Sequence, residues 1–485
     1  MPETRQRIGF AVGSVLFLLI AFSPIPGIPE PVRKMLAVTV LMASWWVSEA
    51  IPLAATALLP LVLFPVLGLA PASRAAAPYA NHLIFLFMGG FMLAQAMQRW
   101  NLHRRIALHI VSVIGTKPRR LILGFMCATA FLSLWVSNTA TVAMMMPIGV
   151  AVTKQVADAI EERNLGIDVT PGRFHFGIDL MLGIAYAASI GGVGSLIGTP
   201  PNVLLAGVME ENYGIQLSFL RWMLFGVPFV AALLPLTWLW LTRFAYPLEI
   251  QEVPGGRQLI KEQIEALGPM SDGERKTAVV FALTAAGWMF RPLWTKWLPS
   301  GELVTDSTVA IASALILFLL PTGSGDRVLD WRWASKLPWE VLVLFGGGFS
   351  LAYGFEASGA SHWVGDLLVR LQGAPLPLFI IAIVILLITL TEFASNTASA
   401  AMSLPILGAA AIGMGYSPLT LCIPATVAAS CAFMMPAATP PNAIVFGTGY
   451  FTIPQMVKAG FFVVLMAVVL TSLFTLLLVR PIFGV

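Results

Sequence analysis

The polar sequence Ser-Asn-Thr occurs twice in this chain, each time near the middle of a long apolar run. The first copy, at 137–139, lies in the run 121–153, and the second, at 395–397, lies in the run 375–413. A continuous helix over 121–153 would be about 50 Å long, whereas the hydrocarbon core of a bilayer is about 30 Å thick. Neither run is therefore one ordinary membrane crossing.

Each run is better explained by two half-helices that meet at the polar triplet. Such a re-entrant hairpin is tolerated at membrane depth where it is buried in protein or lines a wet cavity. Ser, Asn and Thr suit the tip, because their side chains cap the backbone N–H groups that are free where a helix begins. The alternative is a pair of straight spans whose Ser and Thr bond to their own backbone. One triplet would favour that alternative, but two favour hairpins.

The composition indicates a membrane protein. Of the 485 residues, 58% are hydrophobic and 11% are charged, whereas soluble domains usually carry about 25% charged residues. Since a span needs roughly 20 apolar residues, we expect an all-α polytopic membrane protein with about eleven transmembrane helices and two re-entrant hairpins. Arg5 and Arg7 before the first apolar stretch are also typical of a signal peptide, but the many later apolar segments favour a retained first helix.

The repetition extends beyond the triplets. The sequence FMGGFMLA at 87–94 matches FGGGFSLA at 345–352, and both stand at the same distance before their triplets. After the triplets, GTPPN at 198–202 matches ATPPN at 438–442. A longer polar loop in the first copy explains the wider spacing there. The chain is thus two copies of one unit, joined by a charged connector.

Opposite charges on corresponding stretches predict that the two copies are inverted in the membrane. The stretch 99–120, after the first glycine motif, contains Arg and Lys but no acid. Its counterpart carries Glu356, Asp366 and Arg370. Because cytoplasmic loops are enriched in Lys and Arg, we expect the first stretch, the connector and the amino terminus to be cytoplasmic, and the second stretch to be external. In this scheme Arg33 and Lys34 fall on the outer side.

Each Thr-Pro-Pro-Asn motif suits an interrupted helix of the kind found at the binding sites of secondary transporters. Thr199 can cap a half-helix, and Pro200 suits its first turn, where no N–H is needed. The free N–H groups and the dipole of that half-helix form an anion site without a charged side chain. The carbonyls that are exposed before the break, with Ser, Thr or Asn oxygens, can bind a small hard cation such as sodium. The alternative for each proline pair is a simple kink.

Other functions have little support in the sequence. A net charge of +4, gathered in loops beside spans, argues against nucleic-acid binding. The chain has no HExxH, GxSxG or P-loop motif, and its five histidines are not at metal-binding spacing. Glu392 is the acid near a tip, where an acid can relay protons. Since the matching position is Leu134, we expect a structural role for Glu392.

Paired Ser-Asn-Thr tips, each followed by a Thr-Pro-Pro-Asn break, resemble those of the divalent anion:sodium symporter family, and the likeness covers nearly the whole chain. The family includes bacterial dicarboxylate transporters and mammalian sodium-coupled citrate, dicarboxylate and sulfate carriers. The resemblance implies two inverted-topology repeats and an elevator-type homodimer, in which a transport domain moves against a scaffold, and no enzyme activity. The scaffold would span 1–118 and 277–374, the transport domain 119–243 (with a broken helix at 198–202) and 375–485 (with a broken helix at 438–442 and the last helix), and the cytoplasmic connector 244–276.

The resemblance also assigns site residues. The first sodium site would use Ser133, Ser137, Asn138 and Gly198. The second would use Thr391, Ala394, Asn396 and Ala438. The substrate site would be formed by Ser137, Asn138, Thr139, Thr199, Pro200, Ser395, Asn396, Thr397, Thr439 and Pro440.

The expected function is sodium-coupled import of C4-dicarboxylates, such as succinate, malate and fumarate, across the cell (inner) membrane. The implied partners are a small dianionic carboxylate, sodium as the coupling ion, membrane lipid and a second copy of the chain. A citrate or sulfate carrier and a sodium-independent dicarboxylate exchanger are alternatives within the family. An ion channel is the alternative from another class, and the absence of a charged ring or a carbonyl filter motif argues against it.

Overall fold

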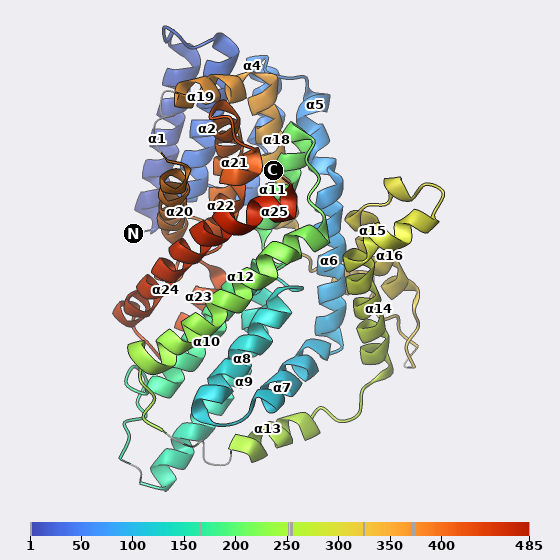
Figure 1. Cartoon of the computed structure of the whole chain (residues 1–485), viewed down its shortest axis with the longest axis vertical. Helices are drawn as coiled ribbons and strands as arrows, with labels where there is room; N and C mark the ends of the chain where they lie inside the picture. Colours follow the sequence, from blue (N-terminus) through green and yellow to red (C-terminus); the bar gives the residue numbers. More distant parts are fainter. Residues whose placement is uncertain are drawn as a thin grey trace.

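Helices make up nearly all of the regular structure of the chain. The computed structural model describes residues 2–164, 166–250, 252, 256–323, 325–369 and 375–484. Within these ranges the one departure from helix and loop is an isolated bridge between Pro321 and Arg327. The predicted all-α class is therefore confirmed, and the molecule is elongated along the direction of most of its helices (Figure 1).

The two copies found in the sequence fold into the same series of helices. The first series is α6 (His82–Arg99), α7 (Leu102–Ile114), α8 (Pro118–Ser133), α9 (Asn138–Glu162), α10 (His175–Gly192), α11 (Pro200–Tyr213), α12 (Phe219–Trp240) and η2 (Leu241–Ala245). The second series is α18 (Trp339–Ala357), α19 (Ala360–Val369), α20 (Leu376–Phe393), α21 (Asn396–Gly413), α22 (Pro418–Ala429), α23 (Pro440–Phe446), α24 (Ile453–Phe474) and η5 (Thr475–Val479). Both long apolar runs break at their triplets, as predicted.

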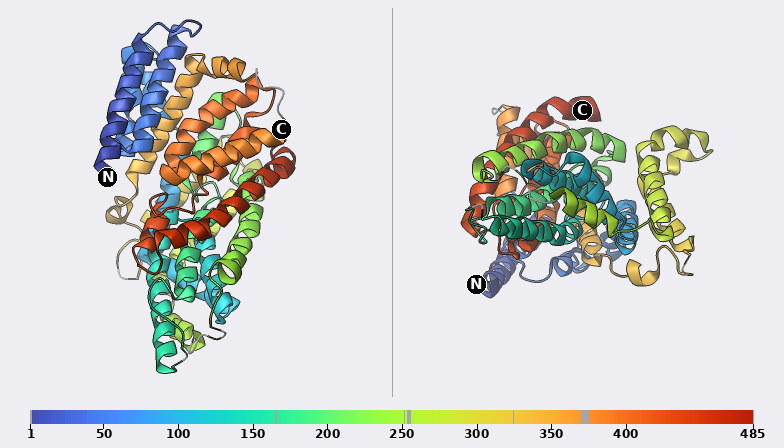
Figure 2. Two further views of the ribbon diagram at one scale, coloured as in Figure 1. Left: turned by 90° about the vertical axis from the view of Figure 1, so that its left-hand side faces the viewer. Right: turned by 90° about the horizontal axis from the view of Figure 1, so that it is seen from below.

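The remaining helices precede or join these series. The first group is α1 (Pro2–Phe22), α2 (Glu30–Ser48), α3 (Leu53–Thr56), α4 (Leu59–Leu67), α5 (Ala72–Ala76) and η1 (Ala77–Ala80). The second is α13 (Gly256–Glu265), α14 (Asp272–Met289), α15 (Arg291–Trp294), η3 (Thr295–Trp297), η4 (Gly301–Leu303), α16 (Asp306–Leu319) and α17 (Trp331–Ala334), and the chain ends with α25 (Arg480–Phe483). Helices α14 to α16 stand at one side of the molecule, next to α6 (Figures 1 and 2).

The two copies are interlocked. Helix α11 of the first copy packs on α21 and α22 of the second, and α23 of the second packs on α9 and α10 of the first. The first hairpin, α8 with α9, lies in the lower half of Figure 1, and the second, α20 with α21, lies in the upper half. This exchange of equivalent contacts, with the hairpins toward opposite ends, is the arrangement expected of inverted repeats.

The structure defines the number of membrane crossings less directly than it defines the all-α fold class. Within the described ranges, six helices are long and apolar enough to span a membrane, or seven if the bent pair α18 and α19 is one span. Three other apolar helices are too short to count alone: 53–67, which is interrupted between α3 and α4, α16, and α22, which stops before the second break. A multi-span membrane protein is confirmed, whereas the count of about eleven crossings stays a prediction.

The repeated glycine motifs mark close helix crossings. A Cβ on Gly89 would come within 2.7 Å of the backbone of Ala310 in α16. A Cβ on Gly347, the equivalent position, would lie 2.4 Å from the carbonyl oxygen of Ala57 beside α3. Only a residue without a side chain permits either approach. The motifs therefore serve packing of α6 and α18, and they explain why both copies keep glycine there.

Ionic contacts place the first basic stretch beside the connector. Arg104 donates to Gln263 at 2.7 Å, and Arg105 pairs with Glu274 at 2.6 Å. These two parts therefore lie on one side of the molecule, as the charge argument requires, although which side is cytoplasmic stays a prediction. Lys34, on the other side in that scheme, is neutralised locally by Glu30 at 2.7 Å. Arg370 lies outside the described residues.

Candidate functional site

The first hairpin tip is organised by the hydroxyl of Ser133, the last residue of α8. This buried oxygen lies 2.6 Å from Oδ1 of Asn138 and 2.7 Å from the carbonyl oxygen of Ala188 in α10. A hydroxyl carries a single proton, so it can donate to only one of these acceptors at a time. The other short contact is satisfied only if its partner atom is a hydrogen-bond donor or if a cation lies between two oxygens.

Two arrangements meet this need. If the Asn138 amide is rotated, its nitrogen donates to the carbonyls of Ala188 at 3.1 Å and Gly198 at 3.2 Å, and to Ser133 at 2.6 Å. With the amide oxygen facing inward, Asn138, Ser133, Ala188 and Gly198 together present a cluster of oxygens. Such a cluster is the ligand set that a small hard cation takes up. The structure thus brings together Ser133, Asn138 and Gly198 of the predicted first sodium site.

The second tip repeats this geometry from different residues. The buried hydroxyl of Thr391 lies 2.7 Å from Oδ1 of Asn396 and 2.9 Å from the carbonyl oxygen of Ala429 in α22. One proton again faces two acceptors. Ala394 and Ala438, predicted to offer carbonyls to this site, are both buried, at the end of α20 and directly before Thr439 respectively.

The two breaks are closed by asparagines that the sequence interpretation did not assign. Asn202 donates from its amide nitrogen to the carbonyls of Gly192 at 3.1 Å, Val193 at 3.4 Å and Ser195 at 2.7 Å. Asn442 donates to the carbonyls of Ala432 at 3.2 Å and Met435 at 3.1 Å. Both side chains are fully buried. They satisfy carbonyls that the helix break leaves free. The available signal was the last letter of the repeated Thr-Pro-Pro-Asn motif.

Capping at the helix starts is less symmetric than the sequence predicts. Thr439 accepts from the backbone N–H of Asn442, whereas Thr199 stands at the same position without a side-chain cap bond. Ser137 accepts from the N–H of Ala140 at 3.4 Å, but Ser395 makes no such bond. The capping role expected for Thr199 is therefore wrong in this structure. The first break is held by Asn202 instead, whose backbone N–H donates to the carbonyl of Thr199 at 3.2 Å.

Glu392 has the structural role expected for it. Its carboxylate, almost fully buried, accepts from the backbone N–H groups of Phe433 at 2.7 Å, Met434 at 3.0 Å and Met435 at 3.1 Å. These three residues form the loop of the second break. In the first copy the position is Leu134, and there the carbonyl of Leu134 accepts from the hydroxyl of Ser195 instead. The two breaks are thus anchored to their tips by different chemistry.

The predicted substrate residues differ in exposure. Thr139 is exposed, while Thr397, its counterpart, is buried. Pro440 is exposed and Pro200 is partly buried, at the first positions of α23 and α11. Thr199 and Thr439 are buried.

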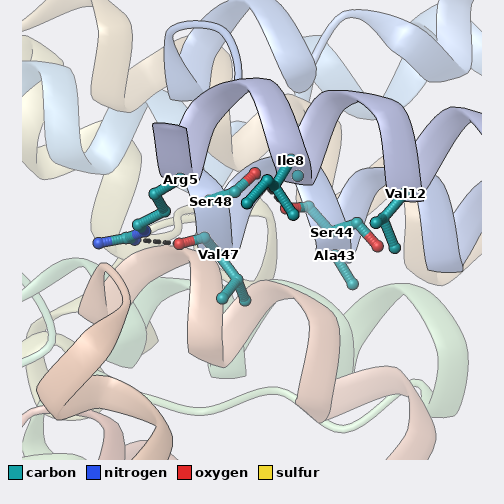
Figure 3. Close-up of a pocket in the computed structure, with 8 residues that line it drawn as sticks. Arg5, Ile8, Val12, Ala43, Ser44, Val47 and Ser48 are labelled. Atoms are coloured by element: carbon teal, nitrogen blue, oxygen red, sulfur yellow. Dashed lines mark hydrogen bonds between the residues drawn. The ribbon is translucent and has the colours of Figure 1, made fainter. Parts of the chain in front are cut away.

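One open groove lies elsewhere. It has a volume of about 600 Å³ between α1 and α2, and it is lined mainly by apolar side chains and serines, including Ile8, Val12 and Ser44 (Figure 3). Arg5 reaches the carbonyl of Val47 at one end. None of the predicted site residues lines this groove, so it is not assigned to the substrate. Among the described residues, no group of three or more His, Cys, Asp or Glu side chains is arranged to hold a metal ion.

Asp179 is a buried acid that the sequence interpretation also missed. It is fully enclosed in α10, and neither carboxylate oxygen has a hydrogen-bond partner among the described residues. Tyr246, just after η2, interacts electrostatically with Asp179. Burial raises the pKa of Tyr246 to about 12, and the Asp179 carboxylate adds to that rise. An isolated acid in an apolar run was the available signal, because such groups are expensive inside a membrane.

Comparisons with known proteins agree with this architecture. The family model of the sodium:sulfate symporter transmembrane region matches residues 6–485. The sodium-dependent dicarboxylate transporter SdcS of Staphylococcus saprophyticus is 42% identical over 486 residues, which cover 99% of this chain and 92% of that protein. The protein of the same name from Staphylococcus aureus (strain MRSA252) is 42% identical over 489 residues, which cover 100% of this chain and 93% of that protein.

Two solved structures share the fold. The YdaH transporter of Alcanivorax borkumensis matches with a TM-score of 0.56 and 12% identity, covering 99% of this chain and 97% of that chain. MtrF of Neisseria gonorrhoeae, described as one of a class of antimetabolite efflux pumps, matches with a TM-score of 0.58 and 11% identity, covering 97% and 99%. At this identity the likeness concerns the fold alone, an all-helical multi-span transporter fold.

Proposed function

This chain belongs to the sodium:sulfate symporter family, the divalent anion:sodium symporters that its motifs resemble, and from this premise we propose that it imports C4-dicarboxylates together with sodium ions. As a member of that family it is a transporter and not an enzyme. The observation that carries the proposal is the repeated geometry of the tips. In each tip one hydroxyl, of Ser133 or Thr391, lies within hydrogen-bond distance of both an asparagine side-chain amide and a helix carbonyl.

These neutral oxygens support sodium as the coupling ion. A hard cation prefers oxygen ligands, and each tip gathers a hydroxyl, an asparagine amide and a backbone carbonyl around one point. The first site would be Ser133, Ser137, Asn138 and Gly198, and the second Thr391, Ala394, Asn396 and Ala438. Two ions bound beside the pocket would supply positive charge for an anionic substrate.

The substrate would lie between the two tips. Its carboxylates would meet Asn138 and Thr139 on one side and Asn396 and Thr397 on the other, with the starts of α11 and α23 nearby. The positive dipole ends at those helix starts favour anions. The Staphylococcus relatives carry the name of sodium-dependent dicarboxylate transporters, which supports a dicarboxylate over citrate or sulfate for this chain.

The remaining organisation of the carrier is part of the same proposal. The transport domain would comprise 119–243 and 375–485 and would move as an elevator against a scaffold of 1–118 and 277–374. The protein would be a homodimer in the cell (inner) membrane, with membrane lipid around it and the amino terminus and the connector 244–276 in the cytoplasm. The inverted packing of the two copies supports a two-state mechanism of this kind.

The test is uptake by purified protein in liposomes. Labelled succinate should accumulate when sodium is outside and should not when choline replaces it. Unlabelled succinate should compete at least tenfold better than butyrate, because a monocarboxylate leaves one set of donors unpaired at a cost of about 1 to 3 kcal/mol for each. Equal competition by the two acids would refute the two-tip site. Uptake that needs internal dicarboxylate but no sodium would identify an exchanger, and currents that do not saturate would identify a channel.

A further inference from the structure

In the first tip, the side chain of Trp135 is not part of the proposed cation site but packs in an aromatic cluster. Trp135, between Ser133 and Ser137, is only 8% exposed. Its ring stacks on Trp288 at 6.4 Å and Phe219 at 6.1 Å, and meets Phe281 edge-on at 5.2 Å. Phe281 and Trp288 belong to α14, in the proposed scaffold. The loop that carries cation ligands is therefore in direct contact with the other proposed domain.

Trp288 is held in place by bonds to Asp306 within the proposed scaffold, and also touches Phe219 of α12 in the proposed transport domain. The indole N–H of Trp288 donates to the carbonyl of Asp306 at 2.9 Å, and the carboxylate of Asp306 pairs with Arg291 at 2.6 Å. The same carboxylate accepts from the backbone N–H of Phe219 at 3.0 Å, and the Phe219 and Trp288 rings stack at 4.7 Å. Trp288 thus has little freedom to follow a moving tip.

Trp135 has little freedom relative to the cation site either. Its backbone N–H donates to the carbonyl of Leu132 at 3.0 Å, and the N–H of Val136 donates to the same carbonyl at 2.9 Å. The turn between Ser133 and Asn138 is therefore tight. A displacement of the indole ring must move both ligand side chains, because only four residues separate them.

The equivalent side chain of the second tip is not docked on the scaffold. Phe393 occupies the position equivalent to Trp135, yet it is 63% exposed. Its only described link to the scaffold is a backbone one, through Arg5 of α1, which donates to the carbonyl of Phe393 at 3.1 Å. One tip is thus docked through an aromatic ring and the other is not. Alternating access moves one repeat or bundle against the other around the site, and unequal docking of the two tips fits one state of such a cycle.

We propose that Trp135 is a positioning residue that couples the first cation site to the scaffold: docking of its ring on Trp288 and Phe281 holds Ser133 and Asn138 in the geometry that binds the cation. The proposal rests on the proposed function, which makes this cluster a sodium site. The contact is made by ring packing alone, since the indole N–H of Trp135 has no hydrogen-bond partner among the described residues. A phenyl ring should therefore replace it in large part.

The test measures sodium binding without transport. The midpoint of thermal unfolding of the purified protein is followed as sodium chloride replaces choline chloride, because an ion that binds the folded state raises it. We expect Trp135→Ala to raise the sodium concentration for half-maximal stabilisation at least about fivefold, since each lost ring pair is worth about two- to tenfold in an equilibrium constant. Trp135→Phe should stay within about twofold of the wild type. Trp288→Ala should match Trp135→Ala, and the double variant should add little to either.

Two further variants separate coupling from mere stability. Trp46 is a fully buried tryptophan of the proposed scaffold itself, on α2, where its indole N–H donates to the carbonyl of Leu53, so Trp46→Ala should lower the unfolding midpoint without moving the sodium concentration. If Trp135→Ala does not fold, Phe281→Leu, a partly buried change on α14, should give a smaller shift in the same direction. An unchanged sodium concentration in Trp135→Ala or Phe281→Leu, or an equal shift in Trp46→Ala, would overturn the coupling. Failure of the wild type to take up succinate would refute the proposed function alone.

Discussion

Ser133 and Thr391 occupy the same position in the two repeats and make the same two hydrogen-bond approaches. Each hydroxyl meets the amide oxygen of the asparagine five residues later, at 2.6 and 2.7 Å. Each also meets a carbonyl near the end of a helix that stops at a break, Ala188 at 2.7 Å and Ala429 at 2.9 Å. A serine and a threonine can thus make the same contacts, because only their hydroxyl groups take part.

The first prediction is that the hydroxyl matters and the methyl group does not. Thr391→Ser should keep sodium-dependent succinate uptake close to wild type. Thr391→Val should raise the sodium concentration for half-maximal uptake about tenfold, because a lost ligand costs about 1 to 3 kcal/mol. Ser133→Ala should act likewise on the first site. Sodium titration of uptake in liposomes measures both, and equal titrations for Thr391→Val and the wild type would show that Thr391 is no ligand.

The second prediction concerns the asparagines that close the breaks. Asn202→Ala removes donors from three carbonyls, whereas Asn442→Ala removes donors from two. Both should lower the thermal unfolding midpoint, and Asn202→Ala should lower it more, since unsatisfied buried groups cost about 1 to 3 kcal/mol each. Asn212→Ala is a matched control, because Asn212 donates to a single carbonyl, that of Ala352. A smaller loss for Asn202→Ala than for this control would contradict the closing role.

The third prediction tests Glu392 as an anchor. Glu392→Gln keeps the shape but places an NH₂ group among the three N–H donors of the second break, so at least one donor loses its acceptor. We expect weaker sodium activation, by about tenfold, and an unchanged preference for succinate over butyrate. Glu356→Gln, at an exposed position of α18, should leave sodium activation unchanged. Loss of pH dependence without loss of sodium affinity in Glu392→Gln would instead indicate proton relay.

The fourth prediction tests the inverted topology. His109 on α7 and His362 on α19 are exposed and lie in corresponding stretches, so they are better labelling positions than buried Ser361. In a background without Cys127, Cys422 and Cys431, cysteines at the two positions should react with an impermeant maleimide from opposite sides of the membrane. If both cysteines reacted from the same side of the membrane, the two repeats could not be inverted.

The fifth prediction concerns Asp179. Because both of its carboxylate oxygens lack partners among the described residues, a charge there would be costly. Asp179→Asn should therefore unfold at the same temperature as the wild type or a higher one, and should retain sodium-dependent uptake. A strong drop in the unfolding midpoint would show that the acid has a partner in the working protein.

Much of this protein could be read from the chain alone, because its main signals are local or repeated. Apolar runs too long for one span predicted hairpins, and the hairpin tips are found at 134–137 and 394–395. The doubled motifs predicted two equivalent units, and the family match over 6–485 confirms the family they indicated. Hydrophobicity and helix-breaking residues act over a few neighbours, so their effects survive without knowledge of the fold.

Contacts between distant segments could not be read in this way. In the sequence, Asn202 and Glu392 are both polar residues beside an interruption of a helix. In the structure, Asn202 closes its own break, whereas Glu392, at the second tip, binds a loop about forty residues away. The capping expected at Thr199 fails while that at Thr439 holds, because neighbouring carbonyls and N–H groups, and not residue type, decide which bond forms. Trp135 reads as one more apolar residue in the sequence; only packing against α14 shows that it joins the cation tip to the scaffold. Side-chain partners are chosen by the tertiary arrangement of backbone donors, acceptors and rings, and that arrangement depends on every helix at once.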